Sequence, residues 1–413
     1  MIIFFLVAHV DSLSLNQTID MVLDNSPSYY ESRLTLSKSR ILFYQTLSTL
    51  LPTVATTGTY TRSEISGIKT DTYSGSMNLS VPLFDLDVIS AIIVSGRQLK
   101  GNKIQHKSDI ANLILRLKIA YYNLANAQEL LRSSEIAIKR AEENLKLIQT
   151  KYDLGAASRL EMLQGEVFHL RALQDRAKAN TLHITAKEEI KSVLGIKNDI
   201  YPTDTLLAPE EVEFPSIDSL MEILDEVNYT IQITQELRNV AHMELVASYL
   251  SFLPKVSFFY GYNYSADSFV FDFEHFKDSA TRNYGISVSF PIFEIKSLIF
   301  NYLNAKKELQ IREFAKKRVL LETGKSLRTT YYKLREAHER IRFAEKSLDA
   351  ATEATTIAKE QYALGTISFL DFLTAEKDFY EAKVSYTSAL SDFYIEKANL
   401  SYFLGELTFN KER

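Results

Sequence analysis

Apolar and small residues recur every three to four positions along two long stretches of the chain. The first series is Leu131, Ser134, Ile138, Ala141, Leu145, Ile148 and Tyr152; the second is Ile341, Ala344, Leu348, Ala351, Thr355, Ala358 and Tyr362. A repeat of 3.5 residues is typical of a coiled-coil seam. The stretch from about 87 to 152 predicts a helix roughly 95 to 100 Å long. Helices over 158–194 and 368–404 are expected to complete two helical hairpins.

Four shorter segments alternate with a period of two, which predicts strands over 53–63, 75–84, 255–265 and 284–292. In the second pair, one face is aromatic and β-branched, and the other is small and polar. The residues of the first kind are Phe258, Tyr260, Tyr262, Tyr264, Tyr284, Ile286 and Val288. A helix precedes each pair, over 15–50 and 219–253, and a Leu-Pro step ends it because the residue before proline disfavours helix. Residues 61–75 and 265–283 are expected to form polar connections.

The order helix, strand pair, hairpin occurs twice. The segment "YDLGAASRLEML" begins at Tyr152, and "YALGTISFLDFL" begins 210 positions later at Tyr362. The Leu-Gly pairs at Gly195 and Gly405 share this offset. The sequence therefore predicts a tandem duplication, with repeats over 13–195 and 216–405, a linker over 196–215 and a tail over 406–413. Residues 1–12 have the short apolar core of a signal peptide that lacks its basic leading region.

Each hairpin is predicted to turn at a short tip, 152–158 in the first repeat and 362–368 in the second. Gly155 and Gly365 stand where a left-handed residue ends a helix. Ser158 begins the next helix with Glu161 three positions on, which is the spacing of a capping box. Ser368 and Asp371 repeat that spacing with a shorter acid.

Composition excludes several classes of function. The net charge is −5, so no nucleic-acid partner is expected, and no cysteine is present for disulfides or thiolate chemistry. The seven histidines are scattered without metal-ligand spacing, and no phosphate-binding glycine loop or nucleophile motif occurs. We therefore predict no enzyme activity, no catalytic residues, no cofactor and no metal site. No apolar run is long enough for a transmembrane helix.

The two faces of the strands are typical of a membrane barrel, with lipid against the aromatic face and water against the polar one. Open sheet edges are not stable in lipid, and the smallest single-chain barrels need about eight strands. Because the chain offers only four, a barrel must be shared between several copies. This argument predicts an oligomer without fixing its number.

The whole arrangement resembles the TolC family of outer-membrane efflux channels. The resemblance rests on "LSLNQTIDMVLDNSPSYYESR", "LLPTV", "SVPLF" and the two tips, in this order and duplicated. It implies a mainly α fold with a small β part, in which four strands from each of three chains close one twelve-stranded barrel above a helical tunnel. It also implies an outer-membrane location, and a homotrimer that contacts outer-membrane lipid, a periplasmic adaptor and an inner-membrane pump.

The resemblance also assigns roles to residues of the tips. The residues that would dock to the adaptor are Leu154, Gly155, Ala156, Ser158, Leu364, Gly365, Thr366 and Ser368. An entrance gate falls to Glu161 and Tyr362, which would link neighbouring coils, and to Asp371 and Thr374, which stand at acidic-ring positions. The chain departs from the family at two of these places: Ile367 stands where an arginine can complete the link, and Thr374 stands where a second acid can narrow the ring. The alternative role for Glu161 and Asp371 is helix capping alone.

Two other functions remain open at this stage, a coiled-coil scaffold without transport and a periplasmic adaptor. A scaffold does not account for four alternating strands placed symmetrically in the duplication. An adaptor is expected to show one hairpin and a lipoyl-like half. Only the channel hypothesis places the protein in the outer membrane, and the sequence does not name its cargo.

Overall fold

A computed structural model describes residues 13–204, 206–209, 213–267, 280–290 and 295–407. The predicted signal peptide, 1–12, and most of the tail lie outside the described residues. The chain divides into two compact units. The hairpin unit comprises residues 1–33, 106–229 and 320–413, and the sheet unit comprises 34–105 and 230–319.

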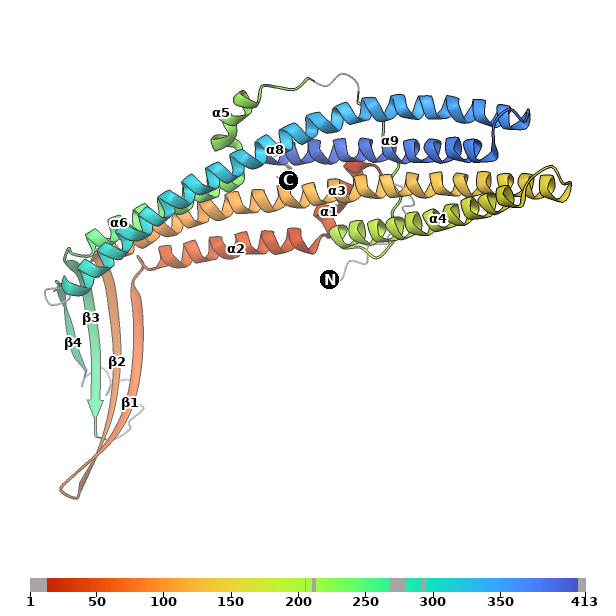
Figure 1. Ribbon diagram of the computed structural model, residues 1–413. Coiled ribbons are helices and arrows are strands. Elements are labelled where there is room, and N and C mark those ends of the chain that lie inside the picture. Colours follow the sequence, from red (N-terminus) through yellow and green to blue (C-terminus); the bar gives the residue numbers. More distant parts are fainter. Residues whose placement is uncertain (1–12, 205, 210–212, 268–279, 291–294, 408–413) are drawn as a thin grey trace. The chain divides into compact units, whose positions relative to one another are not determined.

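Two helical hairpins form most of the hairpin unit (Figure 1). The first joins α3 (Leu86–Asp153) to α4 (Arg159–Leu194), and the second joins α8 (Ile295–Ala363) to α9 (Phe369–Phe403). The predicted seam is confirmed where its members are buried, as they are at Ser134, Ala141, Ile148, Ile341, Ala344, Thr355, Ala358 and Tyr362. Small residues at many of these positions let the paired helices approach closely.

The helix predicted before each strand pair is in fact two helices. The first is divided into α1 (Leu15–Asn25) and α2 (Pro27–Ser48), and the second into α5 (Ile217–Val227) and α6 (Tyr229–Leu250). Ser26 is extended because proline follows it, and Pro27 is suited to the first position of a new helix. At the second break, Asn228 has extended backbone, and its N–H donates to Leu224 O at the end of α5.

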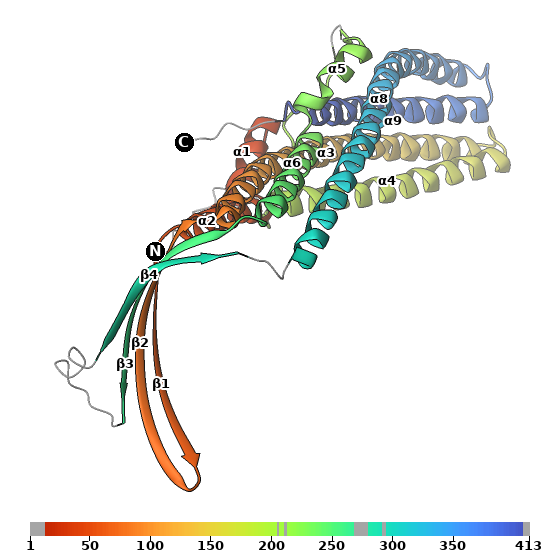
Figure 2. The same ribbon diagram turned by 90° about the vertical axis from the view of Figure 1, so that its left-hand side faces the viewer.

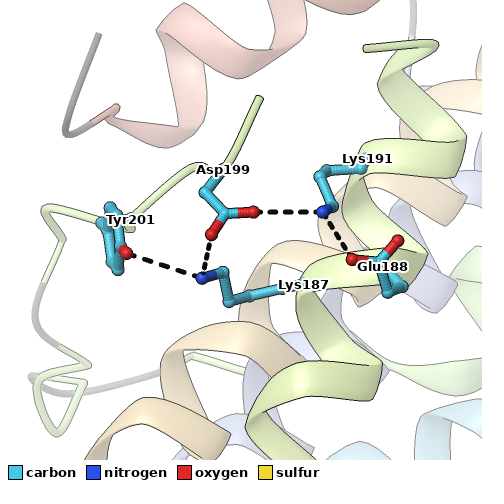
Figure 3. Close-up of polar contacts among 5 residues, drawn as sticks. All are labelled: Lys187, Glu188, Lys191, Asp199 and Tyr201. Atoms are coloured by element: carbon cyan, nitrogen blue, oxygen red, sulfur yellow. Dashed lines mark hydrogen bonds and ion pairs between the residues drawn. The ribbon is translucent and has the colours of Figure 1, made fainter. Parts of the chain in front are cut away.

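The linker between the repeats is fastened to the hairpin unit by polar contacts (Figure 3). Asp199 accepts from Lys187, and from Lys191 at 3.0 Å, both near the end of α4. The Lys187 ammonium also lies 4.9 Å from the centre of the Tyr201 ring. Beyond Tyr201, the chain pairs with Leu13 in a parallel bridge. We call Lys187, Lys191 and Asp199 the linker clasp.

The sheet unit holds four antiparallel strands in the order β1-β2-β3-β4 (Figure 2). They are β1 (Thr53–Ile65), β2 (Ile68–Phe84), β3 (Lys255–Ala266) and β4 (Thr281–Ser289). The predicted bounds 53–63, 75–84 and 284–292 are therefore wrong, and 61–75 is not a loop. Ser66 and Gly67 both have positive φ, so they form the two-residue turn that matches strand twist. Polar cross-strand partners such as Arg62 and Asp71 extend the ladder where the apolar signal ends.

One partly buried carboxylate joins two helices of the sheet unit. Glu236 of α6 accepts from Lys100 of α3 at 2.5 Å, and Arg97 lies 3.8 Å away. Only 6% of the Glu236 side chain is exposed, so removing its partners would leave a buried charge uncompensated. These ion pairs fix α6 beside the first part of α3.

Candidate functional site: the hairpin tips and the sheet faces

Both tips end their first helix in the same way. Gly155 has φ 73° and Gly365 has φ 72°, the left-handed region that glycine adopts without strain. In the first tip, Ala156 N–H donates to Lys151 O at 2.7 Å, and Gly155 N–H donates to Tyr152 O at 2.9 Å. This pair of hydrogen bonds is a Schellman motif, and the same pair recurs at Gly365.

Both tips also begin their second helix with a complete capping box, as predicted. Ser158 N–H donates to Glu161 Oε2 at 2.7 Å, and Glu161 N–H donates to Ser158 Oγ at 3.2 Å. At Ser368 the corresponding distances to Asp371 are 3.3 Å and 3.1 Å. Each tip is thus a rigid turn, fixed by hydrogen bonds on both sides.

The tips present apolar side chains to solvent. Leu154 is 78% exposed and Leu364 is 79% exposed, at matching positions of the two repeats. Of the other predicted docking residues, all are exposed: Gly155, Ala156, Ser158, Gly365, Thr366 and Ser368. A leucine held outward on a hydrogen-bonded turn contributes nothing to the core, so it is available to a partner.

The predicted gate residues Glu161, Tyr362, Asp371 and Thr374 each have a contact within one chain, and the link between neighbouring coils stays a prediction. Among the described contacts, no hydrogen bond joins Tyr362 to Glu161, although burial and then the nearby Glu161 charge raise the pKa of the tyrosine. Glu161 and Asp371 are engaged in their capping boxes. Thr374 donates to Leu370 O of its own helix at 2.8 Å.

Tyr362 lies instead in an apolar cluster that sequence reasoning missed. Its ring stacks on Phe372, with centroids 5.4 Å apart, and lies 5.3 Å from Phe369. Both hairpins contribute, because Ile148 of α3 and Gly165 of α4 pack against Phe369 or its neighbours. We call Ile148, Gly165, Tyr362, Phe369 and Phe372 the tip cluster. The coiled-coil seam predicted burial of Ile148 and Tyr362 but not their meeting with Phe369 and Phe372.

The register of the sheet puts all the residues predicted to face lipid on one face. Phe258 pairs with Ile286, Tyr260 with Tyr284, and β2 adds apolar partners such as Leu79. The opposite face carries mainly small and hydroxyl side chains. A hollow of about 440 Å³ lies against it, lined by Thr57, Thr59, Ser74, Gly75, Ser76, Asn263, Tyr264, Ser265 and Thr281.

Two aromatic residues of β3 do not fit the division into an exposed apolar face and a hydroxyl face. Tyr264 is only 6% exposed, so its side chain offers little surface to lipid within one chain. Phe259 is a large apolar residue on the hydroxyl face, and its ring lies over Gly285, where a Cβ would be 3.2 Å away. Glycine in β4 therefore makes room for this ring.

The described residues contain neither a metal-binding cluster nor a membrane-spanning helix. Within the described ranges, no group of three or more His, Asp or Glu side chains could hold a metal ion. None of the helices over those residues combines the length and apolar character needed to cross a membrane.

Comparison with known proteins gives one consistent family. The profile of the "Outer membrane efflux protein" family matches residues 18–196 and again 228–406. The alkaline protease secretion protein AprF of Pseudomonas aeruginosa is 21% identical over 342 residues, covering 82% of this chain and 70% of AprF. The outer membrane protein TolC of Salmonella enteritidis is 20% identical, covering 87% and 75%. The CmeC outer membrane channel of Campylobacter jejuni superposes with a TM-score of 0.84 at 18% identity, covering 97% and 87%.

Proposed function

Because this chain belongs to the outer membrane efflux protein family, we propose that it forms the outer-membrane exit channel of a tripartite efflux or secretion system. The double match to the family profile agrees with the duplicated fold. In this proposal the sheet unit contributes to a barrel in the outer membrane, and the hairpins line a periplasmic tunnel. The proposal includes no catalytic step and no cofactor.

The observation that carries the proposal is the two-faced sheet. Its aromatic and aliphatic face suits lipid, and its hydroxyl face suits a water-filled lumen. Among the described strands, β1 and β4 each have a neighbour on one side only. Lipid does not tolerate such edges, so β1 of one chain pairs with β4 of the next, and three chains complete a barrel of ordinary size.

The hairpin tips are the proposed contact with the rest of the system. Leu154 and Leu364, on their rigid turns, dock to a periplasmic adaptor, which in turn contacts an inner-membrane pump. The secretion function in the name of AprF and the efflux function in the family name leave two cargo classes, exported proteins and small molecules. The pump selects between them.

The proposed entrance lies at the same tips. Asp371 from each copy approaches the channel axis and attracts cations, while Glu161 completes its capping box in the first hairpin. Thr374 adds no charge at the ring position. A ring with one acid per chain therefore attracts cations less strongly than a ring with two.

Cell fractionation followed by native mass spectrometry tests the proposal. We expect the protein in the outer-membrane fraction, and in mild detergent a species of about 141 kDa, three chains of 47.1 kDa. A monomer in the soluble fraction would overturn the channel and favour a scaffold. A monomer in the inner-membrane fraction would favour an adaptor.

A further inference from the structure

The two hairpins of one chain meet at the tip cluster through apolar contacts. Phe369 and Phe372 of α9 are 0% and 2% exposed, and Tyr362 of α8 is 7% exposed. Ile148 of α3 is fully buried in the same cluster. Three aromatic rings within about 6 Å of each other form favourable edge and stacked pairs beyond their burial.

The first hairpin has a site shaped for Phe369. A Cβ on Gly165 would lie 2.9 Å from Ile148 Cγ2 and 3.4 Å from Phe369 Cε1. The matching position of the second repeat is Ala375, and the position that matches Phe369 in the first repeat is Arg159, which has no aromatic ring. Glycine inside a helix lowers its stability, and its presence here is explained by the close approach of Ile148, with the Phe369 ring in ordinary contact beside it.

The cluster is held together without an ion pair among its described contacts. Two charges lie near it: the Lys151 ammonium is 4.0 Å from the centre of the Tyr362 ring, and the Glu161 carboxylate is close enough to raise the pKa of Tyr362 after burial. Ile367 adds another apolar side chain to the margin of the cluster. Apolar contacts are insensitive to screening, whereas interactions between exposed charges weaken as salt rises.

Away from the tip, the same hairpins separate. A hollow of about 900 Å³ lies between them, lined by Ser134, Ala137, Ala172, Ala179 and other residues of all four helices. Two ion pairs join the hairpins along it, Arg140 to Glu376 at 3.4 Å and Lys383 to Glu129 at 3.4 Å. Beyond the hollow they touch again, where Tyr122 stacks on Tyr394 at 5.2 Å.

We infer that the tip cluster is the contact that fixes the second hairpin on the first at the channel entrance. Phe369 is the residue that joins them, and Gly165 is its seat. Release of Phe369 removes the most buried aromatic ring between the hairpins at the tip, so the tip of the second hairpin becomes free to pivot. This inference rests on the proposed function for its role in gating, but the contact itself can be tested separately.

Spin labels measure the contact directly, because the natural chain has no cysteine and two introduced cysteines are unique. Glu166→Cys on α4 and Asp378→Cys on α9 are exposed positions on the two hairpins. Labelled chains are diluted with unlabelled chains so that each oligomer carries one pair. We expect one narrow distance distribution in the parent, unchanged between 0.1 and 1 M NaCl, and a width at least doubled by Phe369→Ala.

Arg159→Ala is the matched control, because Arg159 occupies the position of Phe369 in the first repeat and lies over Tyr152 on the surface. It should leave the distribution unchanged. If Phe369→Ala does not fold, Phe369→Leu should give an intermediate width. A parent distribution that broadens in 1 M NaCl, or a Phe369 variant with the width of the parent, would overturn the inference.

Planar-bilayer recording separates this inference from the proposed function. Phe369→Ala channels should show additional conductance levels that the parent and Arg159→Ala lack. If the parent protein forms no channel, the proposed function fails, while the distance measurement still decides whether the tip cluster holds the hairpins. If the parent conducts and the Phe369 variants show neither change, only the inference fails.

Discussion

At the scale of single residues, Gly165 gives the clearest departure from general helix propensities. Alanine is favoured over glycine in a helix interior by about 1 kcal/mol, so a replacement should ordinarily stabilise. At Gly165 the added methyl would lie 2.9 Å from Ile148, too close without a shift of the tip cluster. We expect Gly165→Ala to lower the thermal unfolding midpoint.

Gly96 provides the control, because it lies inside another helix, α3, and its added methyl would meet Phe43 at an ordinary 3.6 Å. Gly96→Ala should hold or raise the unfolding midpoint. Both unfolding midpoints are measured by circular dichroism under the same conditions. Equal effects of the two substitutions would show that the close contacts at Gly165 do not exclude a methyl group.

Another residue-scale prediction concerns pH and the linker clasp. Lys187 and then Lys191 lower the pKa of Asp199 through hydrogen bonds. Since the folded pKa is the lower one, the clasp stabilises above the unfolded pKa, near pH 4, and its contribution is lost as pH falls through the folded value. Asp199→Asn should lower the unfolding midpoint at pH 7, and this difference should narrow as the pH falls below about 4.

Glu188→Gln is the comparison for the clasp, because among the ion pairs of the described residues Glu188 contacts only Lys191 of its own helix. Its effect at pH 7 should be smaller than that of Asp199→Asn, since the linker stays attached. A gap between the unfolding midpoints of Asp199→Asn and the parent that does not narrow as the pH falls below 4 would mean that the aspartate acts through something other than its charge.

Whether a residue contact could be predicted from the sequence depends on how close its partners lie along the chain. The capping boxes at Ser158 and Ser368 could be predicted, because the serine and its acid lie three positions apart. The partnership of Phe369 with Gly165 could not, because 204 positions separate them and the period of each helix does not say which hairpin lies beside it. The linker clasp was missed because 196–215 carries no periodic signal at all.

At the scale of elements, the strands test which face meets lipid. Ile286 and Ser287 are neighbours in β4 with side chains on opposite faces of the sheet. A lysine on the lipid face costs about 2 to 4 kcal/mol near the middle of the membrane, whereas a lumen position tolerates it. Ile286→Lys should therefore reduce the amount of assembled outer-membrane oligomer much more than Ser287→Lys does, as read by fractionation and unheated gel electrophoresis. Equal losses would contradict the assignment of faces.

The alternation of apolar and polar residues in the sequence predicted the two faces of the sheet, but it did not predict where the strands end. Alternation in β3 and β4 was clear, and pairing of Tyr260 with Tyr284 follows it. In the first pair the apolar signal fades toward the turn, where Thr, Ser and charged residues continue the ladder to Ser66. Periodicity reports burial, and a strand exposed on both faces gives little of it.

The tips are the other element-scale test. Leu154→Ser with Leu364→Ser removes two exposed apolar side chains without touching the capping hydrogen bonds. Export should fall at least tenfold while the unfolding midpoint and the oligomer remain those of the parent. Ala156→Ser with Thr366→Ser is a milder comparison at the same turns. Loss of the oligomer would instead make the tips assembly elements, and normal export would remove them from the docking surface.

At the scale of the whole assembly, three copies of Asp371 would bring like charges together around one axis. Such a ring attracts cations, and its field falls off over about 10 Å at 0.1 M salt. Asp371→Asn should therefore lower the cation selectivity of single channels in a planar bilayer, with the largest change at low salt. Glu161→Gln is the matched control, because it alters the equivalent capping acid of the first hairpin. If both variants change selectivity equally, the two acids share the pore. If neither does, Asp371 is a helix cap alone, and the narrowest charged point lies elsewhere in the tunnel.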